Sequence, residues 1–336
     1  MGKDIPRSAF FSIKLLLAFL LLGIMFVIAM TFGAADTTVH DVWLATMTEE
    51  VGDKLSMIRE IRLPREVGAI FIGAALAVSG AIMQGITRNP LADPGLLGLT
   101  AGASAALAIT IALIPSANYY AIMIACFIGA AIGATMVFGI SMMKKGPISP
   151  FRIVLAGAAV SAFLQAVSEG VGIYFKISKD VSMWTSGGLN GTTWEQLHIL
   201  IPIITVTIFI ALFLGKQLTI LSLSEDVAVG LGQKVFLIKM ILFLAIIVLA
   251  GASVALVGNL TFLGLIIPHL VRPIVGSDYR LIIPMCAVLG ATFMLLADTI
   301  GRTINAPYET SIAAIISIVG LPFFLYILRK GGNKVS

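Results

Sequence analysis

The sequence predicts an all-α integral membrane protein with about ten transmembrane helices. Of its 336 residues, 59% are hydrophobic and 12% are charged, whereas a typical soluble domain is about 25% charged. Long apolar runs with few charges recur along the whole chain. Such runs are typical of bilayer-spanning helices, because lipid offers no partner for an unpaired backbone N–H or C=O group. The uneven placement of lysine and arginine is the third observation, and it sets the orientation.

The apolar runs can be placed in order along one domain covering residues 1–336, because the loops leave no room for an inserted soluble domain. The eighth run is short and contains Pro268 and Pro273, so we expect a broken or steeply tilted helix there. The ten predicted spans are 15–33, 67–87, 95–114, 119–143, 153–175, 197–215, 235–257, 260–275, 281–301 and 311–328.

The first run ends in TFGAA and faintly resembles a signal peptide, but its length and the nine spans after it favour a retained helix. An outer segment, 34–66, follows and ends in REIRLPRE. Pro64 suits the first turn of the second span, where its missing N–H is no loss. The planar guanidinium groups of Arg62 and Arg65 suit carboxylates on a partner protein. Interfacial anchoring is the alternative.

The stretch RNPLADPGLLG, residues 88–98, lies between the second and third spans. Pro90 and Pro94 prevent one continuous helix, and Asp93 can cap a helix that starts at Pro94. We predict a tight turn at the inner face, near the inner mouth of a pathway. The pathway or gate candidates in this region are Met83, Gln84, Asn89, Pro90 and Asp93.

Small residues are frequent in the second to fifth spans, as in GAALAVSGA and GAAIGA. Small side chains let transmembrane helices approach closely, so we predict a tightly packed bundle. The stretches ALAVSGAIMQGITRNPLADPGLLGL and VLAGASVALVGNLTFLGLII resemble each other and run in opposite predicted directions. An inverted internal repeat is one explanation. Shared Gly/Ala-rich composition is the other.

The fifth span carries Glu169 in QAVSEGVG. An ionisable group at membrane depth is costly and should face the bundle interior or water. Gln165, Ser168 and Glu169 are close enough on a helix to line a polar pathway, but a carboxylate near the outer end could equally be wet. Proton coupling through Glu169 is a more specific hypothesis, and it has less support than either of these two. The outer segment that follows, 176–196, is rich in Gly, Ser, Thr and Trp.

The inner segment 216–235 contains SEDVAVGLG. Ser224 can cap a short helix, and Glu225 and Asp226 in its first turn are favoured by the helix dipole. Gly230 and Gly232 end it. We predict a short amphipathic surface helix on the cytoplasmic face. An ordinary loop helix is the alternative.

Fifteen of the 22 lysines and arginines lie on one predicted side, so both termini are predicted to be cytoplasmic. The net charge of +5 mainly reflects this topology, and no nucleic-acid partner is expected. The sequence lacks G-x-x-x-x-G-K-[ST], H-E-x-x-H, G-x-S-x-G and C-x-x-C motifs. Cys126 and Cys286 fit small core positions, and His40, His198 and His269 are scattered, so no metal site is predicted. Clustered acids, histidines or nucleophile/base pairs that would indicate a membrane enzyme are not found.

Five stretches resemble one known family: RLPR, GAALAVSGAIMQGITRNPLADPGLLGLTAGA, LSLSEDVAVGLG, GNLTFLGLIIPHLVR and LLADTIGR. The chain is similar, over essentially its whole length, to the permease subunits of ABC importers for iron siderophores, haem and vitamin B12, which have the type II importer fold. The resemblance implies a bacterial cell-membrane permease that pairs with an identical or homologous permease. It also implies two separate ATPase subunits, which hold the ATP and Mg, and an extracytoplasmic binding protein. No cofactor is expected on this chain.

The resemblance also implies roles for particular residues. Arg62, Arg65 and Arg302, the last on an outer loop after the ninth span, match positions that meet acidic residues of the binding protein. Residues 165–176 and 184–190 are expected near the substrate route. The predicted ATPase-coupling residues are Ser224, Glu225, Asp226, Val227, Ala228, Gly230, Leu231 and Gly232. An iron(III)-siderophore complex is the expected substrate, with haem or vitamin B12 as alternatives. The alternative from a different class of protein is a proton-coupled secondary transporter.

Overall fold

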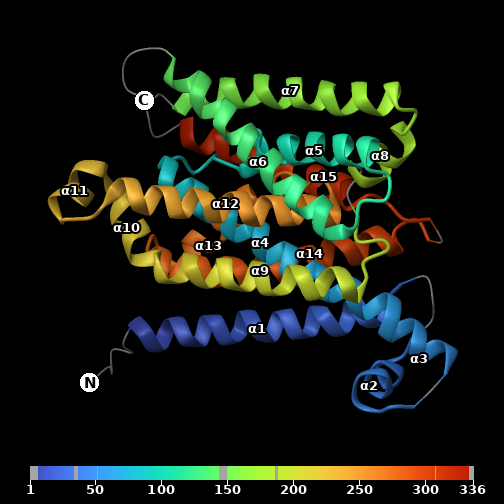
Figure 1. The fold of residues 1–336 in the computed structure, drawn as a ribbon. Helices are drawn as coiled ribbons and strands as arrows, with labels where there is room; N and C mark the ends of the chain where they lie inside the picture. Colours follow the sequence, from blue (N-terminus) through green and yellow to red (C-terminus); the bar gives the residue numbers. More distant parts are fainter. Residues whose placement is uncertain are drawn as a thin grey trace, which may run out of the picture.

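The computed structural model describes residues 7–33, 37–50, 52–143, 150–185, 188–306 and 308–332, and within these residues it contains helices and no strand (Figure 1). The long helices are α1 (Arg7–Thr31), α4 (Leu63–Thr87), α5 (Leu99–Leu113), α6 (Tyr119–Met142), α7 (Pro150–Tyr174), α9 (Trp194–Phe213), α12 (Val235–Val257), α13 (Leu263–Val275), α14 (Tyr279–Thr303) and α15 (Ile312–Gly332). The short ones are α2 (Val39–Met47), α3 (Asp53–Met57), α8 (Ser178–Thr185), α10 (Gly215–Leu223), α11 (Glu225–Gly230), the π-helix Ile58–Arg62 and the 3-10 helix Pro94–Leu97.

Each predicted span coincides with one long helix, which confirms the all-α membrane class. Within the described part of the chain, seven helices are long and apolar enough to cross a membrane. The apolar parts of α5, α13 and α15 are shorter, so the number of crossings stays a prediction. The eighth predicted helix is short, as expected, but α13 runs unbroken through Pro268 and Pro273. The sharp bend lies before it instead, where Phe262 has a left-handed backbone with φ 69°.

Helix α4 is the centre of the bundle and packs against α14, α12, α13 and α9. Glycine allows the closest of these approaches. A Cβ on Gly80 would lie 2.0 Å from the carbonyl oxygen of Gly264 in α13, and one on Gly73 would lie 2.3 Å from that of Gly290 in α14. The predicted tight packing through small residues is therefore confirmed. Helices α4 and α12 run in opposite directions (Figure 1), while the internal repeat stays a prediction.

The helix that contains Pro64 begins earlier than predicted. Helix α3 and the π-helix Ile58–Arg62 continue directly into α4, so Pro64 lies inside a longer helical run. Pro64 is in the first turn of α4, as predicted, but α4 continues a helical run that starts earlier. The π-helical turn lies directly before Leu63 and Pro64. Arg59, on this turn, ties the outer segment down by donating to the backbone carbonyls of Ala45 (2.7 Å) and Glu50 (2.8 Å).

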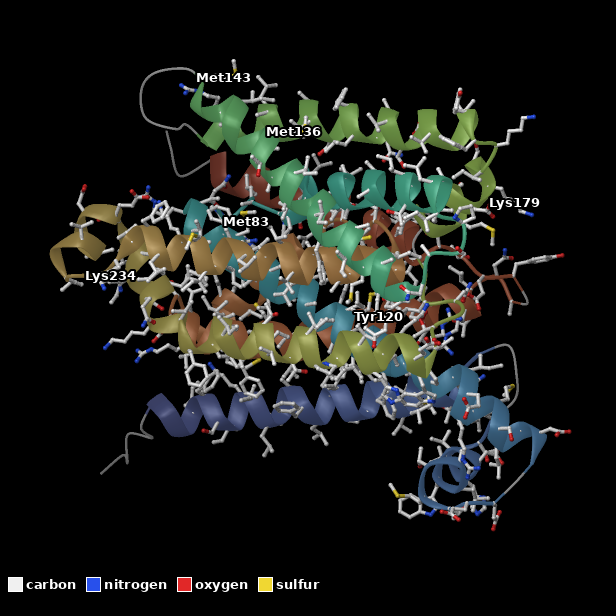
Figure 2. All side chains as sticks on the ribbon, in the orientation of Figure 1. Met83, Tyr120, Met136, Met143, Lys179 and Lys234 are labelled. Carbon is white, nitrogen blue, oxygen red and sulfur yellow. The ribbon has the colours of Figure 1, made fainter. Side chains whose placement is uncertain are left out.

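Charged side chains gather at the two ends of the bundle, with Lys234 at one end and Lys179 at the other (Figure 2). The first residues of α1 and the last described residues of α15 lie at the same end as α10 and α11 (Figure 1). This fits termini on one side of the membrane, and we refer to this end as the inner end, following the predicted orientation. Helix α7 lies along one edge of the bundle, where it packs mainly on α5 and α6.

Candidate functional site

Charged residues from distant parts of the chain meet at the outer end of the bundle. The N-terminal part of α4 crosses the C-terminal end of α14 there, and the loop before α15 closes over them. We call the six residues the outer charge cluster: Arg62, Arg65, Glu66, Asp298, Arg302 and Glu309. Three arginines face three carboxylates, so the cluster carries no net formal charge.

The deepest part of the cluster is a buried chain of ion pairs. Arg302 contacts Asp298, one turn earlier on α14, at 2.9 Å and also pairs with Glu66 of α4. Both carboxylates are fully buried. Burying a carboxylate without a partner costs several kcal/mol, so the arginine is needed where it lies. These pairs fasten α4 to α14 at their outer ends.

The structure alters the prediction for Arg62 and Arg302. Each is only 7% exposed. Arg302 lies within helix α14 and not on the loop after it, so that placement was wrong. Arg62 donates to the backbone carbonyl of Met30 at 2.7 Å and to the Thr37 hydroxyl. A direct ion pair with a partner protein would require either arginine to leave these contacts. Their docking role stays a prediction.

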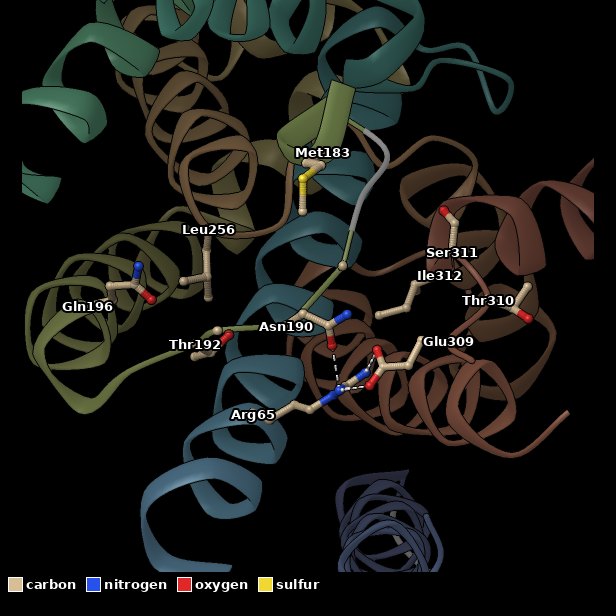
Figure 3. Close-up of a pocket in the computed structure, with 12 residues that line it drawn as sticks. Arg65, Met183, Asn190, Thr192, Gln196, Leu256, Glu309, Thr310, Ser311 and Ile312 are labelled. Carbon is tan, nitrogen blue, oxygen red and sulfur yellow. Dashed lines mark hydrogen bonds and ion pairs between the residues drawn. The ribbon is translucent and has the colours of Figure 1, made fainter. Parts of the chain in front are cut away.

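Arg65 differs because it lies at the rim of an outer pocket of about 430 Å³ (Figure 3). Its guanidinium donates to Asp298 (2.8 Å), to Glu309 (2.8 Å) and to the side-chain oxygen of Asn190 (2.6 Å). Burial raises the pKa of Glu309, but the hydrogen bonds and charge of Arg65 outweigh it and hold that pKa below its usual range. The pocket thus has a charged rim above apolar walls from Leu256 and Ile312.

Sequence reasoning found the arginines but missed their carboxylates. Glu66 directly precedes the second predicted span and Asp298 lies near the end of the ninth, and an ionisable residue at such a position indicates a buried partner. That observation could have paired RLPRE with LLADTIGR. Asn190 falls in the predicted 184–190 gate stretch. Residues 186 and 187 and the side chain of Trp184 lie outside the described part of the structure.

At the inner end, the predicted cap of the short helix is confirmed. The Ser224 hydroxyl accepts a hydrogen bond from the Val227 N–H at 3.0 Å, and Glu225 pairs with Lys239 of α12. The helix ends at Gly230, with Gly232 in a left-handed conformation at φ 77°. The segment holds one more helix than predicted, because α10 covers residues 215–223.

Helix α11 is anchored on one side and exposed on the other. Ala228 is fully buried, whereas Val229 and Leu231 are 62% and 65% exposed, and Val227 and Asp226 are exposed beside them. Exposed apolar side chains next to carboxylates at one end of the bundle are typical of a protein contact surface. The predicted role of this segment in ATPase coupling is compatible with that surface and stays a prediction.

Helix α10 is fixed to the start of α14. The Thr219 hydroxyl accepts from the Tyr279 N–H at 2.8 Å and donates to the Asp278 carboxylate at 3.1 Å. Asp278 also caps α14 and is hydrogen-bonded by Arg280, which lowers its pKa from the usual range. Helix α14 therefore joins the inner segment to the outer charge cluster.

The turn at 88–98 forms as predicted. Arg88 ends α4 with φ 52°, Asn89 accepts from the Leu91 N–H, and Asp93 caps the 3-10 helix by accepting from the Gly95 N–H at 2.7 Å. Pro90 is exposed on the turn. Met83, however, is buried in the main core.

Gln84 is also buried and donates to the Gly264 carbonyl at 3.3 Å. Met83 and Gln84 therefore lie inside this chain's own packing in this conformation. They do not line an open surface.

The three candidates on α7 separate into two faces. Gln165 donates to Glu169 at 3.1 Å, and Glu169 is exposed along the edge of the bundle. Ser168, one residue before Glu169, is buried. The prediction that all three share one polar surface is wrong for Ser168. Glu169 faces outward from this chain, with the apolar Phe163 and Ile173 also exposed on α7.

The whole sequence matches known proteins. The model of the FecCD transport family matches residues 20–330. The iron(3+)-hydroxamate import system permease protein FhuB of Bacillus subtilis (strain 168) is 41% identical over 304 residues, which cover 90% of this chain and 79% of that protein. The hemin transport system permease protein HmuU of Yersinia pestis is 36% identical over 344 residues, covering 100% of this chain and 99% of that protein.

Solved structures give the same result for the fold. An inward-facing metal-chelate type ABC transporter has a TM-score of 0.80 at 28% identity, covering 94% of this chain and 99% of that chain. PsaBC from Streptococcus pneumoniae has a TM-score of 0.62 at 19% identity over 79% of this chain and 89% of that chain, and this likeness concerns the fold alone. The type II importer permease fold expected from the sequence is thereby confirmed.

Proposed function

The chain belongs to the FecCD transport family, and we propose that it is the permease subunit of an ATP-driven importer that moves an iron(III)-siderophore complex across the bacterial inner membrane. It is a multi-pass membrane protein. The observation that carries the proposal is the match over nine tenths of the chain to a permease of iron(3+)-hydroxamate import. In this role the chain does no covalent chemistry on its substrate.

The energy source is a separate ATPase that docks at the inner end. Helix α11 supports this role because Val229, Leu231 and the acidic Asp226 are all exposed close together at the predicted cytoplasmic face. The contacts of Thr219 with Asp278 and Tyr279 would transmit a push on α10 and α11 to α14. ATP and Mg are bound by that partner.

A second permease subunit, identical or homologous, completes the transport pathway. The exposed face of α7 supports this, because it presents apolar side chains (Leu155, Phe163, Ile173) together with Glu169 and Gln165. A carboxylate at membrane depth is tolerated when it faces a water-filled route and not lipid. The face of α7 therefore lines the route between two permeases.

The outer end receives the substrate-loaded binding protein. Glu309, with a side chain 38% exposed, is the charged group at the rim of the outer pocket placed for direct contact. Arg65 is 11% exposed and orients Glu309, and Arg62 and Arg302 hold the platform beneath them. Charged pairs at a transient interface mainly supply steering and register. Reversing the charge of Arg65 should slow binding-protein association, most clearly at low salt.

The substrate is the least determined part of the proposal. The relatives include permeases named for hydroxamate, citrate and hemin import, and vitamin B12 is a further alternative from the sequence resemblance. The ligand carried by the cognate binding protein, identified by mass spectrometry after purification from iron-starved cells, decides between them. An iron-siderophore complex is the expected result, and bound haem or cobalamin would contradict it.

Reconstitution tests the importer mechanism itself. The chain is placed in liposomes with its candidate ATPase and binding protein, and ATP hydrolysis and uptake are followed. Loaded binding protein should stimulate both, and an ATPase inactivated in its own P-loop is the control. Replacing Glu225 and Asp226 with Ala should weaken ATPase association. Uptake that needs no ATPase, collapses with the proton gradient and is lost in Glu169→Gln would establish a secondary transporter instead.

A further inference from the structure

An apolar cleft with a basic entrance lies at the inner end, next to the segment that contains α11. It has a volume of about 1170 Å³ and lies between α6 and α12, which cross each other in Figure 1. Both helices are long and apolar enough to cross a membrane. We name it the α6/α12 cleft, and the residues that matter below are Thr135 and Gly139 of α6, Phe236, Lys239 and Met240 of α12, and Arg88.

The two walls of the cleft explain its shape. The α6 wall is made of small residues, Ala131, Ala134, Thr135 and Gly139, spaced three to four positions apart on one helix face. A Cβ on Gly139 would meet no atom within 4 Å. The α12 wall presents Phe236, Met240 and Leu244, one turn apart, at 81%, 52% and 59% exposure. Large apolar side chains over a shallow wall leave an open groove along the membrane-spanning helices.

Two cations lie where this groove reaches the inner end. Lys239 is the fifth residue of α12, and Arg88 ends α4. Lys239 is paired with Glu225, while Arg88 is exposed and makes no ion pair or hydrogen bond to any described residue. Arg88 also has a left-handed backbone, φ 52°, where glycine is the unstrained choice. The side chain of Arg88 therefore places a positive charge, without a partner among the described residues, at the entrance of an apolar cleft.

We propose that the α6/α12 cleft binds one anionic phospholipid of the inner leaflet, with its phosphate held by Arg88 and Lys239 and its acyl chains along Phe236, Met240 and the small-residue wall of α6. Charge complementarity selects this occupant. Arg88 and Lys239 against the single carboxylate of Glu225 give the entrance a positive balance, and basic pockets between helices at the cytoplasmic side suit anionic head groups. A neutral lipid would fill the groove but leave Arg88 unmatched.

The site has a direct link to the inner segment. Lys239 is the residue that holds Glu225 of α11, so a phosphate at the entrance competes with Glu225 for one ammonium group. The proposal therefore gives opposite signs for the two partners of this ion pair. Removing Lys239 weakens lipid binding, whereas removing the charge of Glu225 frees Lys239 and strengthens it.

Native mass spectrometry of the full chain, delipidated in detergent, tests the proposal. Phosphatidylglycerol and phosphatidylcholine with the same acyl chains are titrated, and the first bound lipid is measured. Phosphatidylglycerol should bind more tightly. Arg88→Gln and Lys239→Gln should each weaken it by about fivefold and leave phosphatidylcholine unchanged, and Glu225→Gln should tighten it. Lys179→Gln, an exposed lysine at the outer end, is the matched control and should change neither lipid.

A second variant tests the groove without touching its charges. In Gly139→Leu the new side chain enters open space, and a helix-destabilising glycine is removed, so the variant should fold normally. A single monodisperse peak on size-exclusion chromatography checks this. It should weaken both lipids by filling the cleft. Equal affinity for the two lipids, or no effect of Arg88→Gln, would overturn the proposal. So would a Gly139→Leu variant that keeps its lipid adducts but loses the mass of a dimer, because a second protein chain would then be the occupant of the cleft.

Discussion

The outer and inner ends of the bundle use charge in different ways. At the outer end, Glu66 and Asp298 are buried and both form ion pairs with the buried Arg302. At the inner end, Glu225 and Lys239 form a partly exposed pair, and the apolar Val229 and Leu231 face outward. The outer charges therefore hold helices together within the chain, while the inner segment leaves its contact surface open for another protein. Charged motifs of similar appearance in sequence have opposite accessibility.

The largest effect is expected from removing the arginine at the centre of the outer charge cluster, which tests whether these charges hold the helices together. Arg302→Met leaves the buried Glu66 without its arginine and leaves Asp298 with Arg65 alone, so the free energy of unfolding should fall by about 3–5 kcal/mol. Denaturant-induced unfolding in micelles measures it. Lys179→Met, exposed at the same end, should change it by less than about 0.5 kcal/mol. Adding Glu66→Gln to Arg302→Met should restore most of the loss, because Asp298 keeps its ion pair with Arg65. An Arg302→Met variant as stable as the parent would contradict the assignment.

The inner end should respond in the opposite way. Val229→Ser combined with Leu231→Ser removes exposed apolar surface, so stability should hardly change, but the affinity for the ATPase should fall at least about tenfold if these side chains are central to the contact. Co-purification and titration with the ATPase measure it. Met47→Ser, another exposed apolar residue but at the outer end, should leave the affinity unchanged. An intact complex in the double variant would move the contact surface away from α11.

The sequence predicted the helices better than their partners. Hydropathy located all ten long helices, because each needs its own apolar run regardless of tertiary contacts. The caps at Ser224 and Asp93 were also predictable, since capping depends on neighbouring residues only. The continuous helix from Asp53 through Pro64 was missed because the π-helical turn has no sequence pattern of its own.

Long-range pairing was beyond the sequence for a different reason. Arg65 and Asp298 are 233 positions apart, and no local rule connects them. Arg302 was expected on an exposed loop, yet the chain remains helical through Thr303 and carries the guanidinium into the bundle. Ser168 was grouped with Gln165 and Glu169 by proximity alone, whereas the helix turns it toward the interior. Which face of a helix is buried depends on neighbours that a single sequence does not reveal.

A smaller effect is expected from removing the N-cap of α11, which tests what stabilises this helix of the inner segment. Ser224→Ala removes the cap of α11 and should destabilise that short helix by about 1 kcal/mol, with little effect on global unfolding. Hydrogen exchange of the Val227 amide, which donates to the Ser224 hydroxyl, should become faster. Ser224→Asp keeps an acceptor at the same position and should preserve protection. Equal exchange in the parent and Ser224→Ala would show that α10 and α12 alone hold the helix.

The smallest expected effect is a pH dependence at the rim of the outer pocket. Hydrogen bonds from Arg65 hold the pKa of Glu309 below its usual range, so its contribution to stability is complete above the unfolded value near about 4.3. That contribution is lost as pH falls through the lower folded pKa. The difference in melting temperature between the parent and Glu309→Gln should therefore be present at pH 7 and shrink as the pH falls through the folded pKa of Glu309. The buried Glu66 and Asp298 occur in both proteins and largely cancel from the difference.

Asp278→Asn at the inner end should follow the same trend, since Arg280 lowers the pKa of Asp278. A difference for Glu309→Gln that does not change with pH would mean that the Arg65 contact contributes through shape and not through charge, and that the rim differs from the buried pairs beneath it.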